Sequence, residues 1–325
     1  MRSGREIAER VLAGDVRALA RAISHVEDDH RLAVEVLREL YPRAGRATTI
    51  GVTGAPGAGK SSLVDRLVES LRARGRTVGV VAVDPSSAFS GGAILGDRVR
   101  MMRHTSDPGV YIRSMATRGF LGGLSRATGD VIDLLDASGK DVVIVETVGV
   151  GQAEVDIARL ADTVLVVLVP GMGDDIQAIK AGILEIADLF VINKADRDGA
   201  DKLESELRQM MALVDDGRPR PAILRTVAIR GDGVDELVEA IVAQGSAPAT
   251  TARRAARAHA RARGRLIDIL GRTLLRRTIE SGLGEAGFER TVERLAAREI
   301  DPYSAADEVL AASRGEAPAP ARREG

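Results

Sequence analysis

Short runs of apolar, mostly β-branched residues alternate with segments of helical period through the middle of the chain. These runs predict strands at Thr48–Thr53, Thr77–Val83, Val110–Arg113, Asp141–Glu146, Thr163–Val169, Leu189–Asn193 and Ala222–Ala228. Unbroken Val and Ile runs are typical of strands that are buried on both faces. The pattern therefore predicts an α/β fold, with a mainly parallel sheet covered by helices. In such a fold, ligands bind at the carboxyl ends of the strands.

The two ends of the chain have a helical period instead. Residues 3–42 predict two or three helices, and residues 250–282 predict one long helix, because apolar positions recur at helical spacing. Two shorter helices are expected near residues 286–298 and 302–313. We therefore expect an N-terminal helical extension (1–45), a central α/β domain (46–245), a C-terminal helical arm (246–313) and a disordered tail (314–325).

The amino-acid composition limits the kinds of catalytic and metal-binding site that the chain can contain. The chain has 325 residues, a formal net charge of −1 and no cysteine. The lack of cysteine excludes disulfides, thiolate metal sites and cysteine nucleophiles. The four histidines, His25, His30, His104 and His259, show no metal-ligand spacing. No apolar run is long enough to span a bilayer and no targeting signal is visible, so we expect a cytoplasmic protein with no membrane partner.

The long C-terminal helix is rich in arginine, with nine between residues 253 and 277. Such a run has two interpretations, a nucleic-acid-binding surface or the solvated basic face of an amphipathic helix. No aromatic residue is interleaved with the arginines to stack on bases, and acidic residues between Glu285 and Glu308 balance the charge. The second interpretation is favoured, and no nucleic-acid partner is expected.

A glycine-rich segment after the first predicted strand matches the pattern G-x-x-x-x-G-K-[ST] in full. The predicted nucleotide-binding residues of this segment are Gly54, Ala55, Pro56, Gly57, Ala58, Gly59, Lys60, Ser61 and Ser62. Glycines allow successive backbone N–H groups to point at a polyphosphate, and the helix that starts here adds the positive end of its dipole. Lys60 would reach the β- and γ-phosphates, and the Ser61 hydroxyl would bind Mg²⁺. The strand–loop–helix context predicts a P-loop nucleoside triphosphatase.

A second motif, Asn193-Lys-Ala-Asp196, closes a later apolar strand. The Asp196 carboxylate can accept hydrogen bonds from N1–H and the N2 amine of guanine, whereas adenine has neither donor on that edge. Asn193 and Lys194 would hold the loop and flank the base. The backbone N–H of Ala228, at another strand end, would meet guanine O6, although Val227 departs from the serine that many GTPases have beside it. GTP is therefore favoured over ATP, with GTP or GDP as the bound nucleotide.

Acidic residues at two other strand ends are candidate Mg²⁺ ligands. Asp84 follows the second predicted strand and Glu146 the fourth, and Asp97 lies in a Gly- and Ser-rich segment between them. Glu146 takes the place of aspartate in Asp-x-x-Gly, whose glycine is Gly149 here and would meet the γ-phosphate. Hydroxyl and carboxylate oxygens suit Mg²⁺. The predicted metal ligands are Ser61, Asp84, Asp97 and Glu146, and the predicted catalytic residues are Lys60, Asp97, Glu146 and Gly149.

Two of these acidic residues also have structural interpretations. Asp84 could cap a helix or stabilise a turn, and Asp97 could form a salt bridge with a neighbouring arginine. No glutamine stands beside Gly149 to orient the attacking water; Gln152 is the nearest, and a surface or helix-start role fits it equally well. We therefore expect slow intrinsic hydrolysis until a partner orders the loops.

Several stretches together resemble the MeaB/ArgK family of GTPases, the bacterial relatives of the human methylmalonic aciduria type A protein. They are GAPGAGKSS (54–62), VDPSSAFSGGAILGDRVRM (83–101), ETVGVGQAEVDI (146–157), GDDIQAIKAGILEIAD (173–188), NKAD (193–196) and DPYSAADEVL (301–310). The resemblance covers almost the whole chain, including both helical extensions.

The resemblance implies a GTP-dependent chaperone of an adenosylcobalamin-dependent acyl-CoA mutase, usually methylmalonyl-CoA mutase. Members gate cofactor loading and protect the mutase from inactivation. Lys60 and Ser61 match the family's phosphate and magnesium residues, and Asp84, Asp97 and Glu146 match its acidic set.

Two further roles follow from the resemblance alone. Residues 170–181 match a mobile loop that signals to the mutase, with Gln177 and Lys180 at its contact positions. From the residues by themselves, Gln177 and Lys180 would be interpreted as exposed helix positions. The C-terminal helices match a dimerisation arm, so the resemblance also implies a homodimer.

Two other functions are alternatives. A nickel-insertion GTPase of the urease or hydrogenase maturation kind has a similar loop architecture, but it needs His or Cys ligands to carry the metal, and this chain has no cysteine and scattered histidines. A kinase linked to amino-acid transport corresponds to the historical ArgK name. The sequence offers no separate phospho-acceptor pocket and no membrane anchor for it.

Overall fold

The computed structural model describes residues 3–28, 30–84, 102–104, 106–116, 126–147, 153–171, 181–213, 220–246 and 248–315. The chain divides into two compact units, residues 1–257 and residues 258–325. The long helix α12 (Pro248–Ser281) begins in the first unit and continues into the second.

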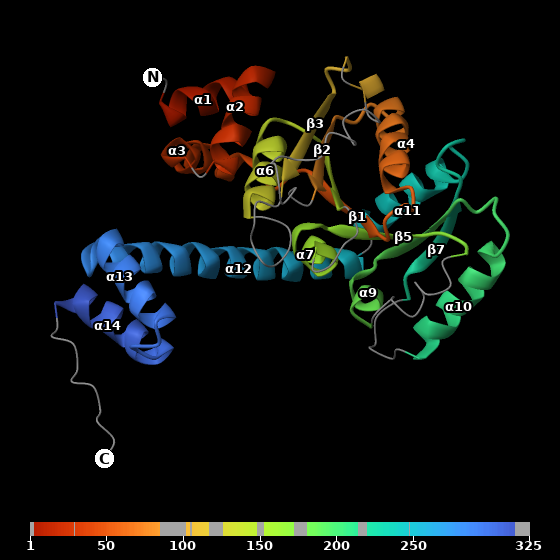
Figure 1. The fold of residues 1–325 in the computed structure, drawn as a ribbon. Helices are drawn as coiled ribbons and strands as arrows, with labels where there is room; N and C mark the ends of the chain where they lie inside the picture. The colour runs from red at the N-terminus through yellow and green to blue at the C-terminus, as the bar shows by residue number, and fades with distance from the viewer. Residues whose placement is uncertain are drawn as a thin grey trace. The chain divides into compact units, whose positions relative to one another are not determined.

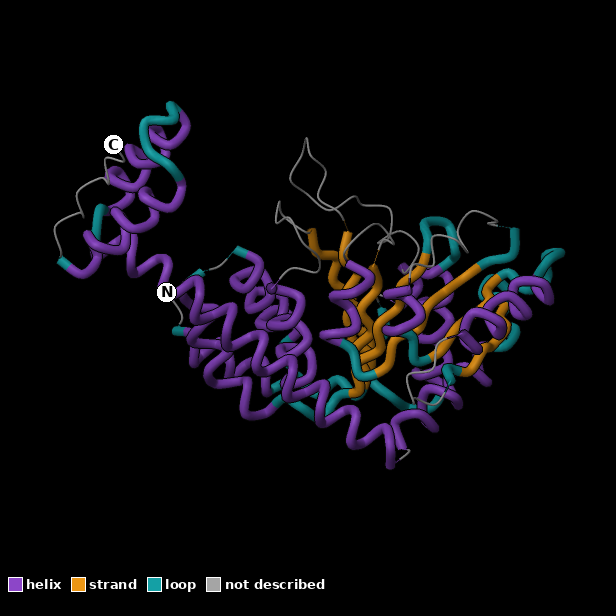
Figure 2. Tube along the Cα trace, turned by 90° about the horizontal axis from the view of Figure 1, so that it is seen from below, coloured by secondary structure: helices purple, strands orange, loops and turns teal. Residues whose placement is uncertain are grey.

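The first unit is built on a seven-stranded sheet with the order β3-β2-β4-β1-β5-β6-β7 (Figures 1 and 2). The strands are β1 (Thr48–Gly54), β2 (Val78–Asp84), β3 (Val110–Ala116), β4 (Val142–Thr147), β5 (Thr163–Leu168), β6 (Leu189–Asn193) and β7 (Ala222–Thr226). All neighbouring pairs in this sheet are parallel, so the predicted α/β fold with a parallel sheet is confirmed. Every strand therefore ends at the same edge of the sheet.

Helices cover both faces of the sheet, because alternate side chains of each buried strand point to opposite faces. In β4, Val142 and Ile144 pack in one apolar cluster and Val143 and Val145 in the other. The first cluster is closed by α4 (Lys60–Ala73) and α11 (Val234–Ser246), and the second by α6 (Arg126–Ala137), α7 (Ala153–Leu160) and α10 (Ala200–Leu213). Figure 1 shows α4 and α6 on opposite sides of the strands.

Three helices precede the sheet and extend the second cluster. They are α1 (Gly4–Leu12), α2 (Val16–Glu27) and α3 (Arg31–Leu40), followed by the short 3₁₀ helix η1 (Tyr41–Arg43). Ser3 and Asp15 cap the first two helices, since their side chains accept hydrogen bonds from the backbone N–H groups of the first turns. Their buried face includes Ile23 and Leu40 and packs with α6, so these helices belong to the first compact unit.

Asp136 on α6 holds the segment that leads from these helices into β1. Its carboxylate accepts hydrogen bonds from three successive backbone N–H groups, those of Gly45 (2.6 Å), Arg46 (3.1 Å) and Ala47 (3.1 Å). We expect Asp136→Ala to lower the free energy of unfolding by about 2 kcal/mol, because the N–H groups lose a charged acceptor. Urea denaturation measures this change. Asp198→Ala, on an exposed loop, is the control, and equal stabilities of the two variants would contradict the prediction.

The second unit contains the later part of α12 with α13 (Gly284–Ala296) and α14 (Pro302–Arg314). Asp301 caps α14 by accepting from the N–H groups of Tyr303 and Ser304, and Arg294 pairs with Glu308 at 2.9 Å between the two shorter helices. No helix within the described ranges combines the length and the hydropathy that crossing a bilayer requires. The helix α9 (Ala181–Ile186) and the 3₁₀ helix η2 (Met102–His104) complete the described elements.

Candidate functional site

The glycine-rich loop joins the end of β1 to the start of α4 and packs directly on its neighbours. Gly54 has a φ of +141°, and a Cβ atom there would lie 2.1 Å from the carbonyl oxygen of Val167. Gly59 has a φ of +87°, and a Cβ atom there would lie 2.4 Å from Asn193 Nδ2. Both positions therefore require glycine, because any other side chain would push the loop away from β5 and β6.

Lys60 is the first residue of α4, and its side chain lies inside the loop. Its Nζ atom donates hydrogen bonds to the carbonyl oxygens of Gly54 (2.8 Å) and Ala55 (2.9 Å), and the residue is only 5% exposed. The ammonium group is thus fixed beside the backbone N–H groups at the start of the helix. This combination of a fixed cation and a helix N-terminus favours a bound polyphosphate.

Ser61 and Glu146 meet next to the loop. The Ser61 hydroxyl donates to Glu146 Oε1 at 2.7 Å, and both residues are buried. Glu146 comes into reach because β4 is paired with β1 in a register that sets Glu146 opposite Val52. A hydroxyl and a carboxylate are hard oxygen ligands of the type that Mg²⁺ prefers.

Asn193 ties the glycine-rich loop to the end of β7. Its Nδ2 atom donates to the carbonyl oxygen of Ala58 at 2.9 Å. Its Oδ1 atom accepts from the hydroxyl of Thr226 at 3.2 Å and from the backbone N–H of Ala228 at 3.1 Å. The N–H that the sequence assigns to guanine O6 is therefore directed at Asn193 here. Contact with a base would require it to turn from this acceptor.

Lys194 and Asp196 follow Asn193 in the turn after β6. Lys194 adopts a φ of +56° and donates from Nζ to the carbonyl oxygen of Gly57 at 2.8 Å. Asp196 is exposed, and its Oδ2 atom lies 3.2 Å from Arg230 Nη1. The hydrogen bond with Asp232, together with the charges of Asp232 and Asp196, raises the pKa of Arg230. The Asp196 carboxylate thus has the guanidinium of Arg230 beside it.

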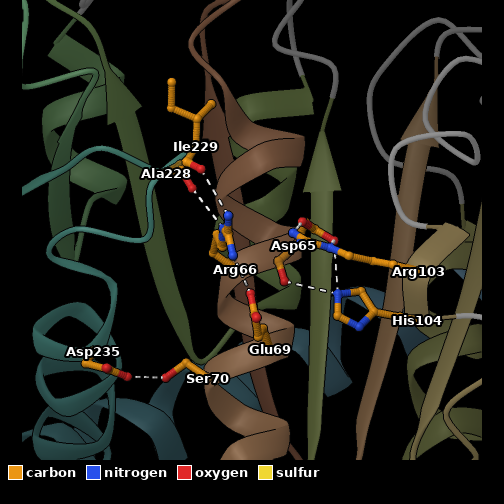
Figure 3. Close-up of polar contacts among 9 residues, drawn as sticks. All are labelled: Asp65, Arg66, Glu69, Ser70, Arg103, His104, Ala228, Ile229 and Asp235. Carbon is orange, nitrogen blue, oxygen red and sulfur yellow. Dashed lines mark hydrogen bonds and ion pairs between the residues drawn. The ribbon is translucent and has the colours of Figure 1, made fainter.

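Arg103 and His104 of the 3₁₀ helix η2 contact α4 directly (Figure 3). Arg103 Nε donates to Asp65 Oδ1 at 2.8 Å, and His104 Nε2 lies 2.9 Å from the same oxygen atom. Asp65 is buried one helical turn after Ser61. This contact connects α4, which begins at the phosphate loop, with residues 103 and 104, which follow the predicted magnesium ligand Asp97 in the sequence.

The structure thus brings together the glycine-rich loop, Glu146, Asn193, Lys194 and Ala228 at the carboxyl edge of the sheet. Asp84 is the last residue of β2, and its side chain is outside the described part. Four other predicted residues lie outside the described residues altogether, namely Asp97, Gly149, Gln177 and Lys180, as does Gln152.

A family model described as methylmalonyl Co-A mutase-associated GTPase MeaB matches residues 19–282. The chain belongs to the MeaB family. It is therefore a GTPase, with a guanine nucleotide as its ligand, and the family resemblance noted from the sequence motifs is confirmed.

Similar proteins support the same assignment. A relative from Pyrococcus abyssi is 48% identical over 309 residues, which cover 94% of this chain and 95% of the relative. The methylmalonic aciduria type A homolog of Caenorhabditis elegans is 35% identical over 246 residues, covering 71% of this chain and 62% of the relative. Among solved structures, a protein named LAO/AO transport system kinase has a TM-score of 0.68 and 26% identity, covering 94% of this chain and 96% of its own. Its fold is the P-loop fold of this MeaB-family chain.

Three residues around this MeaB-family site were missed by the sequence reasoning, namely Asp65, Arg66 and Arg230. Arg66 donates to the carbonyl oxygens of Ala228 and Ile229, which are 162 and 163 residues away in the chain. A sequence pattern gives no sign of partners at this distance, because the contacts are made to backbone atoms. Arg230 lies only two residues after Ala228. This closeness to a predicted contact of the base is the one feature of the sequence that pointed to Arg230.

Proposed function

We propose that this GTPase gates the loading of adenosylcobalamin onto an acyl-CoA mutase, methylmalonyl-CoA mutase first of all, and protects that mutase from inactivation. The observation that carries the proposal is the match to the mutase-associated family over residues 19–282. This range includes the phosphate loop, the Asn193-Lys-Ala-Asp196 motif and the whole of α12. The name of the Caenorhabditis elegans relative points to the same metabolic step.

In the proposed mechanism, the loop of residues 54–62 wraps the phosphates of GTP. Lys60 supplies a positive charge close to the β- and γ-phosphates, where negative charge shifts as the terminal bond breaks. Asp196 accepts hydrogen bonds from N1–H and N2 of guanine, Asn193 and Lys194 hold the loop beneath the base, and Ala228 offers its N–H to guanine O6.

The oxygen ligands at the phosphate end fit Mg²⁺. Ser61 and Glu146 already lie within hydrogen-bond distance of one another at 2.7 Å, and both are hard oxygen donors. Asp84 and Asp97 are proposed to complete the set, and Gly149 to contact the γ-phosphate. The metal, when bound, would neutralise charge on the β- and γ-phosphate oxygens.

The role of Glu146 is testable through the requirement for metal. We expect Glu146→Gln to raise the Mg²⁺ concentration for half-maximal GTP hydrolysis about tenfold, because the amide removes a negative charge but keeps the shape and one acceptor. Titration of hydrolysis with MgCl₂ measures the change. Asp141→Asn is the control, since this residue directly precedes β4 and so lies at the end of the strand opposite to Glu146. An unchanged Mg²⁺ requirement in the Gln variant would remove Glu146 from the metal site.

The proposed partner can be tested directly. Purified protein is mixed with methylmalonyl-CoA mutase and with a related acyl-CoA mutase, and GTP hydrolysis and co-purification are measured. Acceleration of hydrolysis by one mutase, together with slower transfer of adenosylcobalamin in the presence of GDP than of GTP, supports the gating role. Gln177→Ala and Lys180→Glu should each weaken the acceleration, since these positions are proposed to signal to the mutase.

The same experiment separates the alternatives. Labelled γ-phosphate of GTP should appear as inorganic phosphate; labelled protein would instead favour a kinase linked to transport. Recovery of a nickel enzyme and no mutase from co-purification would favour nickel insertion. Either result would overturn the chaperone proposal without affecting the assignment as a GTPase.

We also propose a homodimer formed through the C-terminal helices. Six large apolar residues of the second unit are between 45% and 60% exposed on α12, namely Leu266, Ile267, Ile269, Leu270, Leu274 and Leu275. Apolar residues gathered on one helix in this way are typical of an interface. Sedimentation equilibrium should give twice the mass of the chain, and Leu270→Glu should give the mass of one chain.

A further inference from the structure

Arg66 is the residue of α4 that contacts the turn after β7. Its Nε atom donates to the carbonyl oxygen of Ala228 at 3.1 Å, and its Nη2 atom donates to the carbonyl oxygen of Ile229 at 3.0 Å (Figure 3). The third side of the guanidinium is held by Glu69, whose Oε2 atom lies 2.7 Å from Nη1. Two of the three guanidinium nitrogens of Arg66 thus donate to one turn, and the third pairs with Glu69 on its own helix.

The contacted turn is the one that carries the proposed contact with guanine O6. Ala228 is only 2% exposed, and the two peptide groups that flank its Cα atom are each held by a side chain. Its N–H points at Asn193 Oδ1, whereas its carbonyl oxygen accepts from Arg66. An acceptor on a base can replace Asn193 for the N–H if the hydrogen bond to the Ala228 carbonyl keeps the residue in place. Arg66 provides that support.

Arg66 also lies on the helix that begins at the phosphates. It follows Lys60 by six positions, which corresponds to about 9 Å along the helix axis. Both ends of the proposed nucleotide site are therefore attached to one rigid element, the helix α4. The phosphate loop continues into this helix, and the turn at Ala228 is hydrogen-bonded to its side. The geometry points to Arg66 as a positioning residue that sets guanine specificity by fixing the turn at Ala228. This inference rests on the proposed base contacts of Asp196 and Ala228.

A nearby arginine, at the C-cap of the same helix, offers a control. Arg74 contacts Ser70 Oγ at 3.2 Å and Asp235 Oδ1 at 3.4 Å, so it connects α4 to α11. No contact with residues 227–230 is recorded for it within the described part of the chain. Arg74→Ala therefore removes an equal charge at the end of α4 and leaves the contacts of the turn at residues 227–230 intact.

The experiment measures the dissociation constants of GDP and ADP for wild type, Arg66→Ala, Arg66→Lys and Arg74→Ala. We expect Arg66→Ala to weaken GDP binding about tenfold and to leave ADP binding unchanged, so that the preference for guanine falls by the same factor. Arg66→Lys should restore part of the preference, because one ammonium can still donate to one carbonyl. Arg74→Ala should keep the wild-type preference.

Two results would overturn the inference. One is a GDP-to-ADP preference in Arg66→Ala within twofold of wild type; the other is a parallel loss of GDP and ADP binding, which would indicate a general role in stabilising α4. Asp196→Ala is measured alongside. If Asp196→Ala loses the preference for GDP over ADP while Arg66→Ala retains it, the proposed base site is supported and the proposed role of Arg66 is wrong. If wild type itself shows no preference for GDP, the proposed base site fails as well.

Discussion

Lys60→Ala is expected to lower GTP hydrolysis about a thousandfold while the protein remains folded. The Lys60 ammonium is fixed by the carbonyl oxygens of Gly54 and Ala55 and is almost fully buried. A positive charge held in this way needs no reorganisation when charge moves toward the leaving β-phosphate, and its effect is strong because water is largely excluded. Alanine leaves the loop with N–H donors only. Single-turnover hydrolysis of GTP measures the loss.

The control for this prediction is Lys202→Ala, since that side chain is 81% exposed on α10 and far from the loop in the chain. It should hydrolyse GTP at the wild-type rate. Circular dichroism establishes that both variants are folded. A rate for Lys60→Ala within tenfold of wild type would mean that the ammonium does not act on the transferred phosphate, and that the loop backbone alone provides most of the stabilisation.

Much of the fold could be predicted from the sequence, because its central strands are buried on both faces. β6 has the predicted bounds, Leu189–Asn193, since an apolar run and a polar motif meet at its end. β3 was predicted to end at Arg113 but reaches Ala116. Arg113 interrupts the apolar run, and in the structure it pairs with Glu27 of α2. The charge of Arg113 is paired with a residue of a distant helix, which a local pattern does not reveal.

β7 differs in the opposite direction. It was predicted to continue to Ala228 but ends at Thr226, because Val227 leaves the sheet to form an isolated antiparallel bridge with Asp232 and a turn begins at Ala228. Their backbone groups are used there: Val227 N–H donates to the carbonyl oxygen of Asp232, and Ala228 N–H donates to Asn193. Apolar residues are buried in this turn as in a strand, so hydrophobicity alone could not separate the two. The difference falls at the place where the base is proposed to bind.

The site was predictable where its residues are close in sequence. The phosphate loop and the Asn193 motif have fixed spacings that follow from their chemistry. The residues that support them are not local: Asp65 meets Arg103 and His104, and Arg66 meets the turn after β7. These contacts all come from α4. The helix that sequence reasoning assigned to the phosphates therefore also holds residues 103 and 104 and the turn after β7.

Asp196→Asn is expected to weaken GDP binding about a hundredfold and to make xanthosine diphosphate the preferred nucleotide. Guanine presents two donors to the carboxylate, N1–H and the N2 amine. Asparagine presents one acceptor and one donor, so its amide N–H would face the N2 amine of guanine without a partner. Xanthine carries an oxygen at that position and matches the amide in full. The neighbouring Arg230 retains Asp232, at 2.8 Å, so the turn should keep its conformation.

Calorimetric titration with GDP and with xanthosine diphosphate tests this prediction, and Asp198→Asn is the matched control because it makes the same change on an exposed residue of the same loop. The control should bind GDP as wild type does. If Asp196→Asn kept the wild-type affinity for GDP, the carboxylate would not contact the base, and its ion pair with Arg230 would be its main role. A loss of GDP binding without any gain for xanthosine diphosphate would instead mean that the turn has moved, since the complementary base would then find no partner either.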